Sequence, residues 1–446
     1  MNLRSSVSGV VWPAVLTGEA ATLMAMAREL DRTQWWKAEE IEARQRDQLA
    51  ALLAHARATV PWYRERLRGL DVSRWREIPL LRKDDVRRRR AELLSRRVPA
   101  DHGPTHEAKT SGSTGEPLRV TCTALTGLFW QSLALRDDAW HRRELQGRLV
   151  AIRSGRDAPD PLAVRELPGW GLLPPRLQPS GSATVLFHLA PIARQAEILA
   201  AKDPTYLLTY PSNARDLCAY ARRRALRLPS LRAVHTYGEP LTPDVRAACR
   251  DTWGVPVHDV YSCEELGFLA LQCPDHEHYH VQSESVFLEV LDERGEPVPP
   301  GGIGRVVLTS LHNWAMPLVR YDIGDLAEVG GPCPCGRGLP VLRRVLGRRR
   351  NRISLPEGRT AWPDVGAIWA AIPEVERIQL VQRGPEDIEV RFARATPLAP
   401  AEERAAASRL RAALGHPFQL SFRGPVPLPR LPNGKLETFI DARGAT

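Results

Sequence analysis

The sequence lacks any apolar run long enough to span a bilayer, and its first residues lack the charged-then-apolar build of a secretory signal. Cysteine is scarce: seven residues in a chain of 446 do not make a disulfide framework. These absences predict a cytoplasmic protein with no membrane partner. Hydrophobic residues make up 43% of the chain, enough for a large domain plus a smaller one.

Lysine is also nearly missing, because five lysines and 57 arginines make up the 62 basic residues behind the net charge of +10. A basic surface attracts anions, among them nucleic acids and anionic cofactors. The arginine runs at 87–90 and 348–350 are short and lack interleaved aromatic residues. Solvated helix faces or local anion contacts explain such runs better than a nucleic-acid track, so we expect no nucleic-acid partner.

The segment Thr110 to Pro117 carries four hydroxyl side chains and two glycines. In a loop of this composition successive backbone N–H groups can point into one concavity and bind an anion, and the hydroxyls add donors. The segment therefore suits a polyphosphate. It is not the common GxxxxGK[ST] loop, because Glu116 and not a lysine follows the second glycine. A polar surface turn is the alternative interpretation.

Helical and strand patterns alternate along much of the chain. Residues 38–58 predict an amphipathic helix, 119–150 a strand and then a long helix, and 154–182 a loop rich in proline and glycine. Further on we expect strands at 183–189, 206–210, 233–237 and 257–261, with helices at 191–201 and 212–226. This alternation predicts α/β layers.

Polar residues gather where these strands end. The turn 238–240 and the segment 261–265 each close a predicted strand, and ligands of open α/β sheets bind beyond such ends. Glu264 and Glu265 can hold Mg²⁺, or can form an acidic helix start that the helix dipole favours. Asp325 follows a glycine turn, where a carboxylate can accept both hydroxyls of a ribose.

Cysteine and histidine gather in two places about sixty residues apart. The residues concerned are Cys273, His276, His278, His280, Cys333 and Cys335. Thiolates and imidazoles together form tetrahedral zinc sites, and four protein ligands make such a site structural and not catalytic. The alternative is a set of buried free cysteines beside an exposed histidine cluster.

Taken in order, these motifs resemble the adenylate-forming ligase superfamily and, within it, the phenylacetate–coenzyme A ligase family. The resemblance covers most of the chain. It rests on segments 60–67, 110–117, 238–240, 261–265, 320–325, 347–348 and 430–435. It implies a large N-terminal α/β domain of layered sheets and helices, residues 1–347, which binds ATP and substrate. It also implies a small, mobile α+β C-terminal domain, residues 348–446, which carries the catalytic lysine.

The resemblance implies a role for individual residues. Lys435 would act in the adenylation step, Glu265 would bind Mg²⁺, and Asp325 would hold the ribose. Residues implied to contact the ATP phosphates or the rest of the nucleotide are Thr110, Ser111, Gly112, Ser113, Thr114, Gly115, Gly238, Glu239, Pro240, Asp259, Tyr261, Ser262 and Arg348. Some members share a similar Cys…His…Cys-Pro-Cys-Gly pattern, which favours Cys273, His280, Cys333 and Cys335 as structural zinc ligands, with His276 as the competing imidazole.

The implied activity is ATP-dependent, AMP-forming activation of an aromatic carboxylic acid as an acyl-adenylate, followed by transfer to a thiol, coenzyme A by default. Members of the family often form homodimers. The segments 128–135, 210–213 and 236–237 are candidates for the acid pocket. Glu264 replaces the family's Ser or Thr, and Arg350-Asn351 replaces an acidic pair at the hinge. These departures keep other hypotheses open: an amine or carrier-protein acceptor, another oxyanion such as nitrite, or a nucleotide-binding regulator without turnover.

Overall fold

The computed structural model describes residues 3–109, 118–154, 160, 162–171, 178–349, 353–355, 360–361, 371–372, 375, 377–428 and 438–443. The chain divides into two compact units. Unit 1 combines Met1–Leu149, Glu166–Thr184 and His258–Val345, and unit 2 combines Val150–Arg165, Val185–Val257 and Leu346–Thr446. Within the described ranges, no helix has the length and apolarity needed to cross a bilayer.

Unit 1 begins with helices that pack through apolar faces. Its helices are α1 (Gly18–Thr33), α2 (Ala38–Thr59), α3 (Pro61–Arg66), α4 (Lys83–Arg88), α5 (Arg90–Leu93) and α6 (Ala124–Trp140), with 3-10 turns at Val72–Glu77 and Ala100–His102. On α2, Leu49, Leu52 and Ala56 recur at helical spacing and are buried. Pro61 opens α3 at the position where its fixed φ suits a helix start.

The strands of unit 1 form a largely antiparallel sheet behind these helices. They are β1 (Leu81–Arg82), β9 (Val257–Cys263), β10 (Gly267–Gln272), β11 (Tyr279–Val281), β12 (Val286–Leu291), β13 (Ile303–Ser310), β14 (Tyr321–Val329) and β15 (Val341–Arg348). Neighbours follow the order β12-β13-β14-β15-β11-β10-β9, and β1 pairs with β14. A separate hairpin pairs β2 (Thr105–Lys109) with β3 (Arg119–Thr123).

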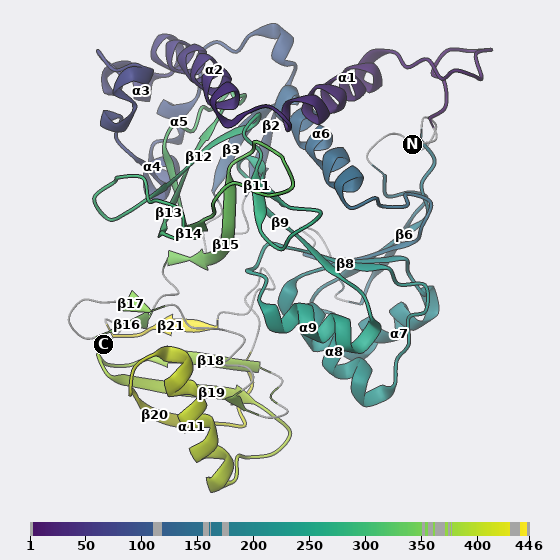
Figure 1. Cartoon of the computed structure of the whole chain (residues 1–446), viewed down its shortest axis with the longest axis vertical. Coiled ribbons are helices and arrows are strands. Elements are labelled where there is room, and N and C mark those ends of the chain that lie inside the picture. Colours follow the sequence, from purple (N-terminus) through teal and green to yellow (C-terminus); the bar gives the residue numbers. More distant parts are fainter. Residues whose placement is uncertain are drawn as a thin grey trace. The chain divides into compact units, whose positions relative to one another are not determined.

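Unit 2 contains an α/β layer. Its strands are β4 (Leu149–Arg153), β5 (Val164–Leu167), β6 (Ala183–Phe187), β7 (Tyr206–Thr209) and β8 (Ala233–Tyr237), in the order β8-β7-β4-β6-β5. Its helices are α7 (Ile192–Lys202), α8 (Pro211–Arg224) and α9 (Pro243–Trp253), which lie together against this layer in Figure 1. Their buried faces and the strands share one apolar core that includes Leu207, Leu217 and Val234.

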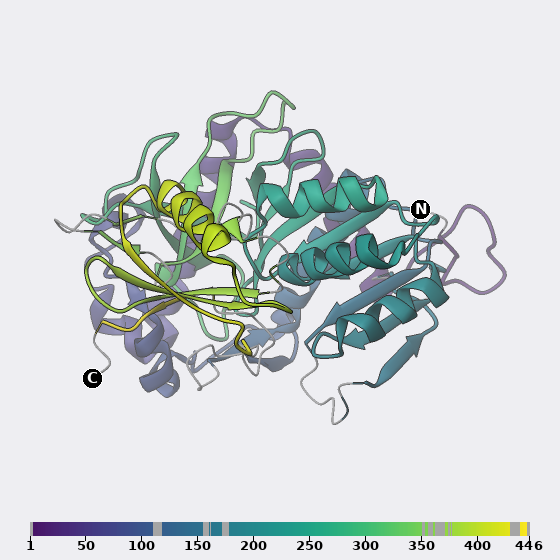
Figure 2. The same cartoon turned by 90° about the horizontal axis from the view of Figure 1, so that it is seen from below.

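The last hundred residues have a core of their own. Their elements are β16 (Ile353–Ser354), β17 (Thr360–Ala361), β18 (Arg377–Gln382), β19 (Asp387–Ala393), α11 (Pro400–Leu414), β20 (Gln419–Arg423) and β21 (Phe439–Asp441). Four strands follow the order β20-β19-β18-β21. Figure 2 shows the yellow-green helix α11 lying along this sheet. Leu410 of α11 shares one apolar core with Leu380 and Phe392 of the sheet.

The predicted fold class is confirmed: α/β layers precede a small α+β portion at the C-terminus. Within 119–150 the predicted strand and the helix after it are confirmed as β3 and α6, but the helix ends at Trp140 and β4 starts at Leu149. The loop expected at 154–182 contains β5, a strand of four residues whose weak, exposed pattern carries no strand signal. The domain boundary at 347/348 and the mobility of the C-terminal domain stay predictions.

Candidate nucleotide and metal sites

The acid predicted to hold a ribose is fixed by a tyrosine. The Tyr261 hydroxyl of β9 donates to Asp325 Oδ2 of β14 over 2.8 Å. Both side chains are buried, at 8% and 7% exposure. On β14, Tyr321, Ile323 and Asp325 alternate inward, as the period of two in a strand requires. The structure therefore brings together two of the residues assigned to the nucleotide site.

The two neighbouring glutamates face different surroundings. Glu265 is 6% exposed and its Oε1 accepts from the Tyr321 hydroxyl at 3.2 Å, whereas Glu264 is exposed in the turn after β9. Of this pair, Glu265 is thus the acid held inside unit 1, and Glu264 lies outward. The magnesium role of Glu265 stays a prediction.

Asp259 and Ser262 lie on opposite faces of β9. Asp259 is 4% exposed and its Oδ2 accepts from the Tyr279 hydroxyl of β11 at 2.7 Å, while its backbone N–H donates to Gln272 Oε1 at 2.9 Å. Ser262 is half-buried and pairs with Phe268 of β10. Both were assigned to nucleotide binding, yet the carboxylate of Asp259 is directed to a tyrosine within the sheet.

In unit 2 the assigned residues lie in a turn that is shaped by its backbone. Gly238 follows β8 with a φ of +73°, a left-handed conformation that glycine adopts without strain. Next to it, Glu239 Oε2 accepts from the Ser212 backbone N–H at 3.0 Å. Gly347 has a φ of +88°, and a Cβ there would lie 2.6 Å from Pro240 Cγ. The turn 238–240 and the predicted hinge glycine are therefore in close contact.

Several assigned residues lie outside the described part of the chain. They are Thr110 to Pro117, Arg350-Asn351 and Lys435. The strands that flank the predicted phosphate loop are described: Lys109 of β2 pairs with Arg119 of β3. Arg348 is the last residue of β15.

The cysteine and histidine residues converge in unit 1. Side-chain ligand atoms of Cys273, His280, Cys333 and Cys335 all lie within 4.8 Å of one another. The imidazole in this set is that of His280 and not that of His276. A backbone bond from Cys273 N to His278 O at 2.8 Å closes the turn between β10 and β11. We call these four residues the Cys/His cluster.

The spacing within the cluster fits a tetrahedral metal ion. Zn–S bonds of about 2.3 Å place two sulfurs about 3.8 Å apart, and a sulfur and an imidazole nitrogen about 3.6 Å apart. The Sγ atoms of Cys273 and Cys333 are separated by 3.9 Å, and Cys335 Sγ and His280 Nε2 by 3.4 Å. The four residues present therefore fit zinc in their chemistry and in their separations.

Burial and hydrogen bonding set the protonation state and the ring orientation of His280. Burial lowers the pKa of His280 to about 4, so the imidazole is neutral at pH 7, the form that ligates a metal. Its Nδ1 lies 3.4 Å from the Leu339 carbonyl, which leaves Nε2 directed to Cys335. His278 Nε2 lies 3.0 Å from Cys333 Sγ, so this ring is a hydrogen-bond partner of a cluster sulfur.

Sequence reasoning missed the residues that hold the acids. Tyr279 and Tyr321 donate to Asp259 and Glu265, and a buried pair joins Arg320 to Glu289 over 3.1 Å. Arg320 also donates to the Ile78 carbonyl and has a φ of +50°. The alternation in Tyr321-x-x-x-Asp325 does predict that these two side chains share one face of a strand. It does not predict their partners, because each partner lies in another segment of the chain.

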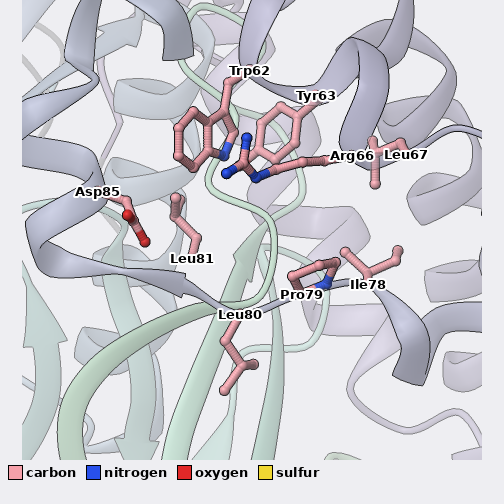
Figure 3. A pocket seen from close by; sticks show the side chains of 9 residues that line it. All are labelled: Trp62, Tyr63, Arg66, Leu67, Ile78, Pro79, Leu80, Leu81 and Asp85. Carbon is pink, nitrogen blue, oxygen red and sulfur yellow. The ribbon is translucent and has the colours of Figure 1, made fainter.

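A small cavity of about 110 Å³ lies elsewhere in unit 1. Trp62 and Arg66 of α3 cover one side, with the Arg66 guanidinium 3.5 Å above the Trp62 ring, and residues 78–81 and Asp85 form the other, as Figure 3 shows. Pockets for drug-sized ligands measure about 300–1,000 Å³. None of the assigned nucleotide or metal residues lines this cavity, so it is not the nucleotide site.

Comparison with known proteins indicates the class to which these residues belong. The family described as AMP-binding enzyme matches residues 179–314. Phenylacetate–coenzyme A ligase from Thermus thermophilus is 28% identical over 76% of this chain and 77% of its own length. The Escherichia coli enzyme of the same name is 24% identical, over 73% of each chain.

Solved structures share the fold. A 2-hydroxyisobutyryl-CoA ligase in the postadenylation state has a TM-score of 0.73 at 21% identity, over 93% of this chain and 92% of that one. The anthranilate CoA ligase AuaEII gives 0.55 at 18% identity, over 74% and 64%. These comparisons confirm the resemblance seen in the sequence: residues 179–314 match the AMP-binding enzyme family, and the chain is similar to phenylacetate–coenzyme A ligases over about three quarters of its length.

Proposed function

We propose that the protein joins an aromatic carboxylic acid to AMP and then passes the acyl group to the thiol of coenzyme A. In the first step a carboxylate oxygen attacks the α-phosphorus of ATP, the bond to the bridging oxygen breaks, and pyrophosphate leaves. In the second step the thiol sulfur attacks the acyl carbon and AMP leaves. The observation that carries the proposal is the buried pair of Tyr261 and Asp325 at the predicted ribose position.

Asp325 and its neighbours would bind the nucleoside. The Tyr261 hydroxyl occupies Asp325 Oδ2, so this bond fixes the orientation of the carboxylate that would accept the ribose hydroxyls. The backbone turn 238–240 would lie along the adenine, since glycine at a φ of +73° keeps the turn free of side-chain bulk. Thr110 to Gly115 would donate to the phosphates through backbone N–H groups and hydroxyls.

Glu265, through a bound Mg²⁺, and Lys435 would stabilise the negative charge around the α-phosphorus. Glu265 is a buried carboxylate whose orientation the Tyr321 hydroxyl fixes, and carboxylate oxygens are the ligands that Mg²⁺ takes beside phosphates. A bound Mg²⁺ would neutralise phosphate charge. The ammonium of Lys435 would stabilise the charge that builds on the bridging oxygen during attack.

Aromatic side chains in unit 2 support an aryl acid as the substrate. The rings of Tyr210 and Tyr237 lie 4.8 Å apart at 34°, at the carboxyl ends of β7 and β8. The two strands are parallel, so both ends meet at one edge of the layer, where ligands of α/β sheets bind. The Tyr210 hydroxyl donates to Ser154 Oγ at 3.1 Å, which fixes the ring in place.

The acceptor follows from the relatives and not from a residue of this chain. The relatives named above are coenzyme A ligases, and a thiol of the same kind is therefore the acceptor proposed here. An amine or a carrier-protein thiol remains the alternative product route, motivated by Arg350-Asn351. For the Cys/His cluster we propose a structural zinc ion held by Cys273, His280, Cys333 and Cys335, with no part in the reaction.

The test is acid-dependent pyrophosphate release from ATP and Mg²⁺, measured across a panel of aryl acids. Lys435→Ala should lose adenylation by a factor of about 100 or more, because it removes the cation from the developing charge. Lys202→Ala, which changes another lysine, should release pyrophosphate at the wild-type rate. Product analysis with and without coenzyme A then identifies the acceptor. Nucleotide binding without pyrophosphate release across the whole panel would instead support the regulator hypothesis.

A further inference from the structure

The Cys/His cluster and the nucleotide-site acids share one short strand. β11 spans Tyr279 to Val281, and successive side chains on a strand point to opposite faces. His280 points to the cluster, where its Nε2 lies 3.4 Å from Cys335 Sγ. Tyr279 points the other way and donates to Asp259 Oδ2 at 2.7 Å. A backbone displacement at His280 would therefore also shift Tyr279, the donor that holds Asp259.

Asp259 connects Tyr279 to a second residue of β9, Tyr261. Asp259 and Tyr261 are two residues apart and both buried, so they face the same side of the strand. Tyr261 in turn donates to Asp325 at 2.8 Å. Two hydrogen bonds thus connect β11 to the predicted ribose acceptor on β14, through adjacent positions of one strand face.

The strand pairing makes this connection stiff. Gln272 of β10 lies opposite Tyr279, and its Oε1 accepts from the Asp259 backbone N–H at 2.9 Å. The same β11 residues pair with β15, where Tyr279 faces Leu342 and His280 faces Val341. β15 begins at Val341, six residues after Cys335, and ends at Arg348. The cluster therefore restrains β11, which carries Tyr279, and β15, which ends at the assigned nucleotide residue Arg348.

We propose that Tyr279 and Asp259 are positioning residues that couple the Cys/His cluster to the nucleotide site, so that metal loading sets the affinity for nucleotide. Asp259 then acts within the protein and does not contact the nucleotide, in contrast to the role expected from the sequence. Its carboxylate is 4% exposed and already holds a buried tyrosine hydroxyl. The inference rests on the proposed nucleotide site, but not on the identity of the acid or acceptor.

The first experiment separates positioning from direct contact in the full-length protein. Tyr279→Phe removes the hydroxyl while keeping the ring, and should weaken AMP binding, measured by calorimetry, by about three- to tenfold, the effect of one buried hydrogen bond. KM for ATP should rise in parallel with kcat nearly unchanged, and zinc content by atomic emission should stay at the wild-type value. Asp259→Asn keeps an oxygen acceptor for Tyr279 and should bind AMP within about twofold of wild type.

Tyr206→Phe is the matched control, because Tyr206 is a strand tyrosine of the same 5% exposure as Tyr279 but lies on β7. It should leave AMP affinity unchanged. The opposite pattern, in which Asp259→Asn loses AMP and Tyr279→Phe keeps it, would show that Asp259 touches the nucleotide and would overturn the proposal. Because AMP binding needs no acid, this readout stands even where no acid gives turnover.

The second experiment tests the metal end of the coupling. Removing zinc from the wild-type protein with a chelator should weaken AMP binding, and adding zinc back should restore it. In Tyr279→Phe the same treatment should have a smaller effect, because the link is already broken. Equal AMP affinity with and without zinc would overturn the proposal, as would a purified wild-type protein that binds no stoichiometric metal while binding AMP.

Discussion

The assigned residues of unit 1 and those of unit 2 are held in place in different ways. In unit 1 the assigned acids are side chains, and each is held by a tyrosine hydroxyl from another strand of the sheet, as Asp325 is by Tyr261. In unit 2 the turn 238–240 is held by backbone geometry, with Gly238 at positive φ and Gly347 packed against Pro240. Unit 1 should therefore be sensitive to the loss of polar atoms, and unit 2 to the gain of a Cβ.

The largest effect is expected at Arg320, in unit 1. Arg320 is 3% exposed and pairs with Glu289 over 3.1 Å, and burial raises the pKa of Glu289 in spite of that partner. Arg320→Ala would leave a buried carboxylate uncompensated, which costs about 3–5 kcal/mol. Urea unfolding measures the loss. Arg76→Ala, which breaks an exposed pair with Glu296, should cost less than about 1 kcal/mol. Similar losses for the two variants would contradict the comparison.

A pH dependence should arise from His312, whose ring stacks on Phe129 at 3.8 Å. Burial lowers the pKa of His312 to about 4. Its unfolded value is about 6.5, so the unfolded chain binds the proton first and stability falls as pH drops from 6.5 to 4. By pH 5 the expected loss is about 2 kcal/mol.

His312→Gln should remove this contribution, since Gln can donate to the Glu284 carbonyl that His312 Nε2 reaches at 2.7 Å, yet does not titrate. Unfolding free energies at pH 7 and pH 5 for both proteins give the difference, and the contributions of other histidines cancel. Parallel pH curves for the two proteins would show that His312 is not the source.

Asp325 tests the side-chain half of the comparison through binding. Asp325→Asn should raise KM for ATP by about 10- to 100-fold, the effect of hydrogen bonds to a charged acceptor. The fold should be kept, because Asn can still accept from Tyr261. With 2′-deoxy-ATP the variant should differ less from wild type, since one ribose hydroxyl is already missing. An equal loss for both nucleotides would place Asp325 away from that hydroxyl.

Gly347 tests the backbone half. Gly347→Ala places a Cβ 2.6 Å from Pro240 Cγ at a φ of +88°. The left-handed conformation alone costs an alanine about 1–2 kcal/mol. Gly254→Ala is the matched control in unit 2, with a φ of +72° and nothing within 4 Å. Urea unfolding should show a larger loss for Gly347→Ala, and the excess measures the contact with Pro240. Equal losses of unfolding free energy in the two variants would mean that the turn 238–240 moves to make room for the added Cβ.

Much of the architecture could be predicted because local patterns carried it. The strands at 119–123 and 233–237 were placed at their observed bounds, and the helix expected at 38–58 runs from Ala38 to Thr59. The short strand β5 was missed because its residues are largely exposed and lack alternation. Spacing and resemblance named all four residues of the Cys/His cluster, and the structure brings their ligand atoms within 4.8 Å of one another.

The sequence by itself determined which chemical groups are present and in which order: the hydroxyl-rich loop, the acids after strand ends, and the two cysteine-bearing segments. Only the tertiary structure decided which partner each group has. Tyr279 and Asp259 are twenty residues apart, and Tyr261 and Asp325 sixty-four, yet both pairs meet within hydrogen-bond distance. The physical reason is that side-chain hydrogen bonds between strands depend on sheet order and register, which non-local packing sets and no local pattern encodes.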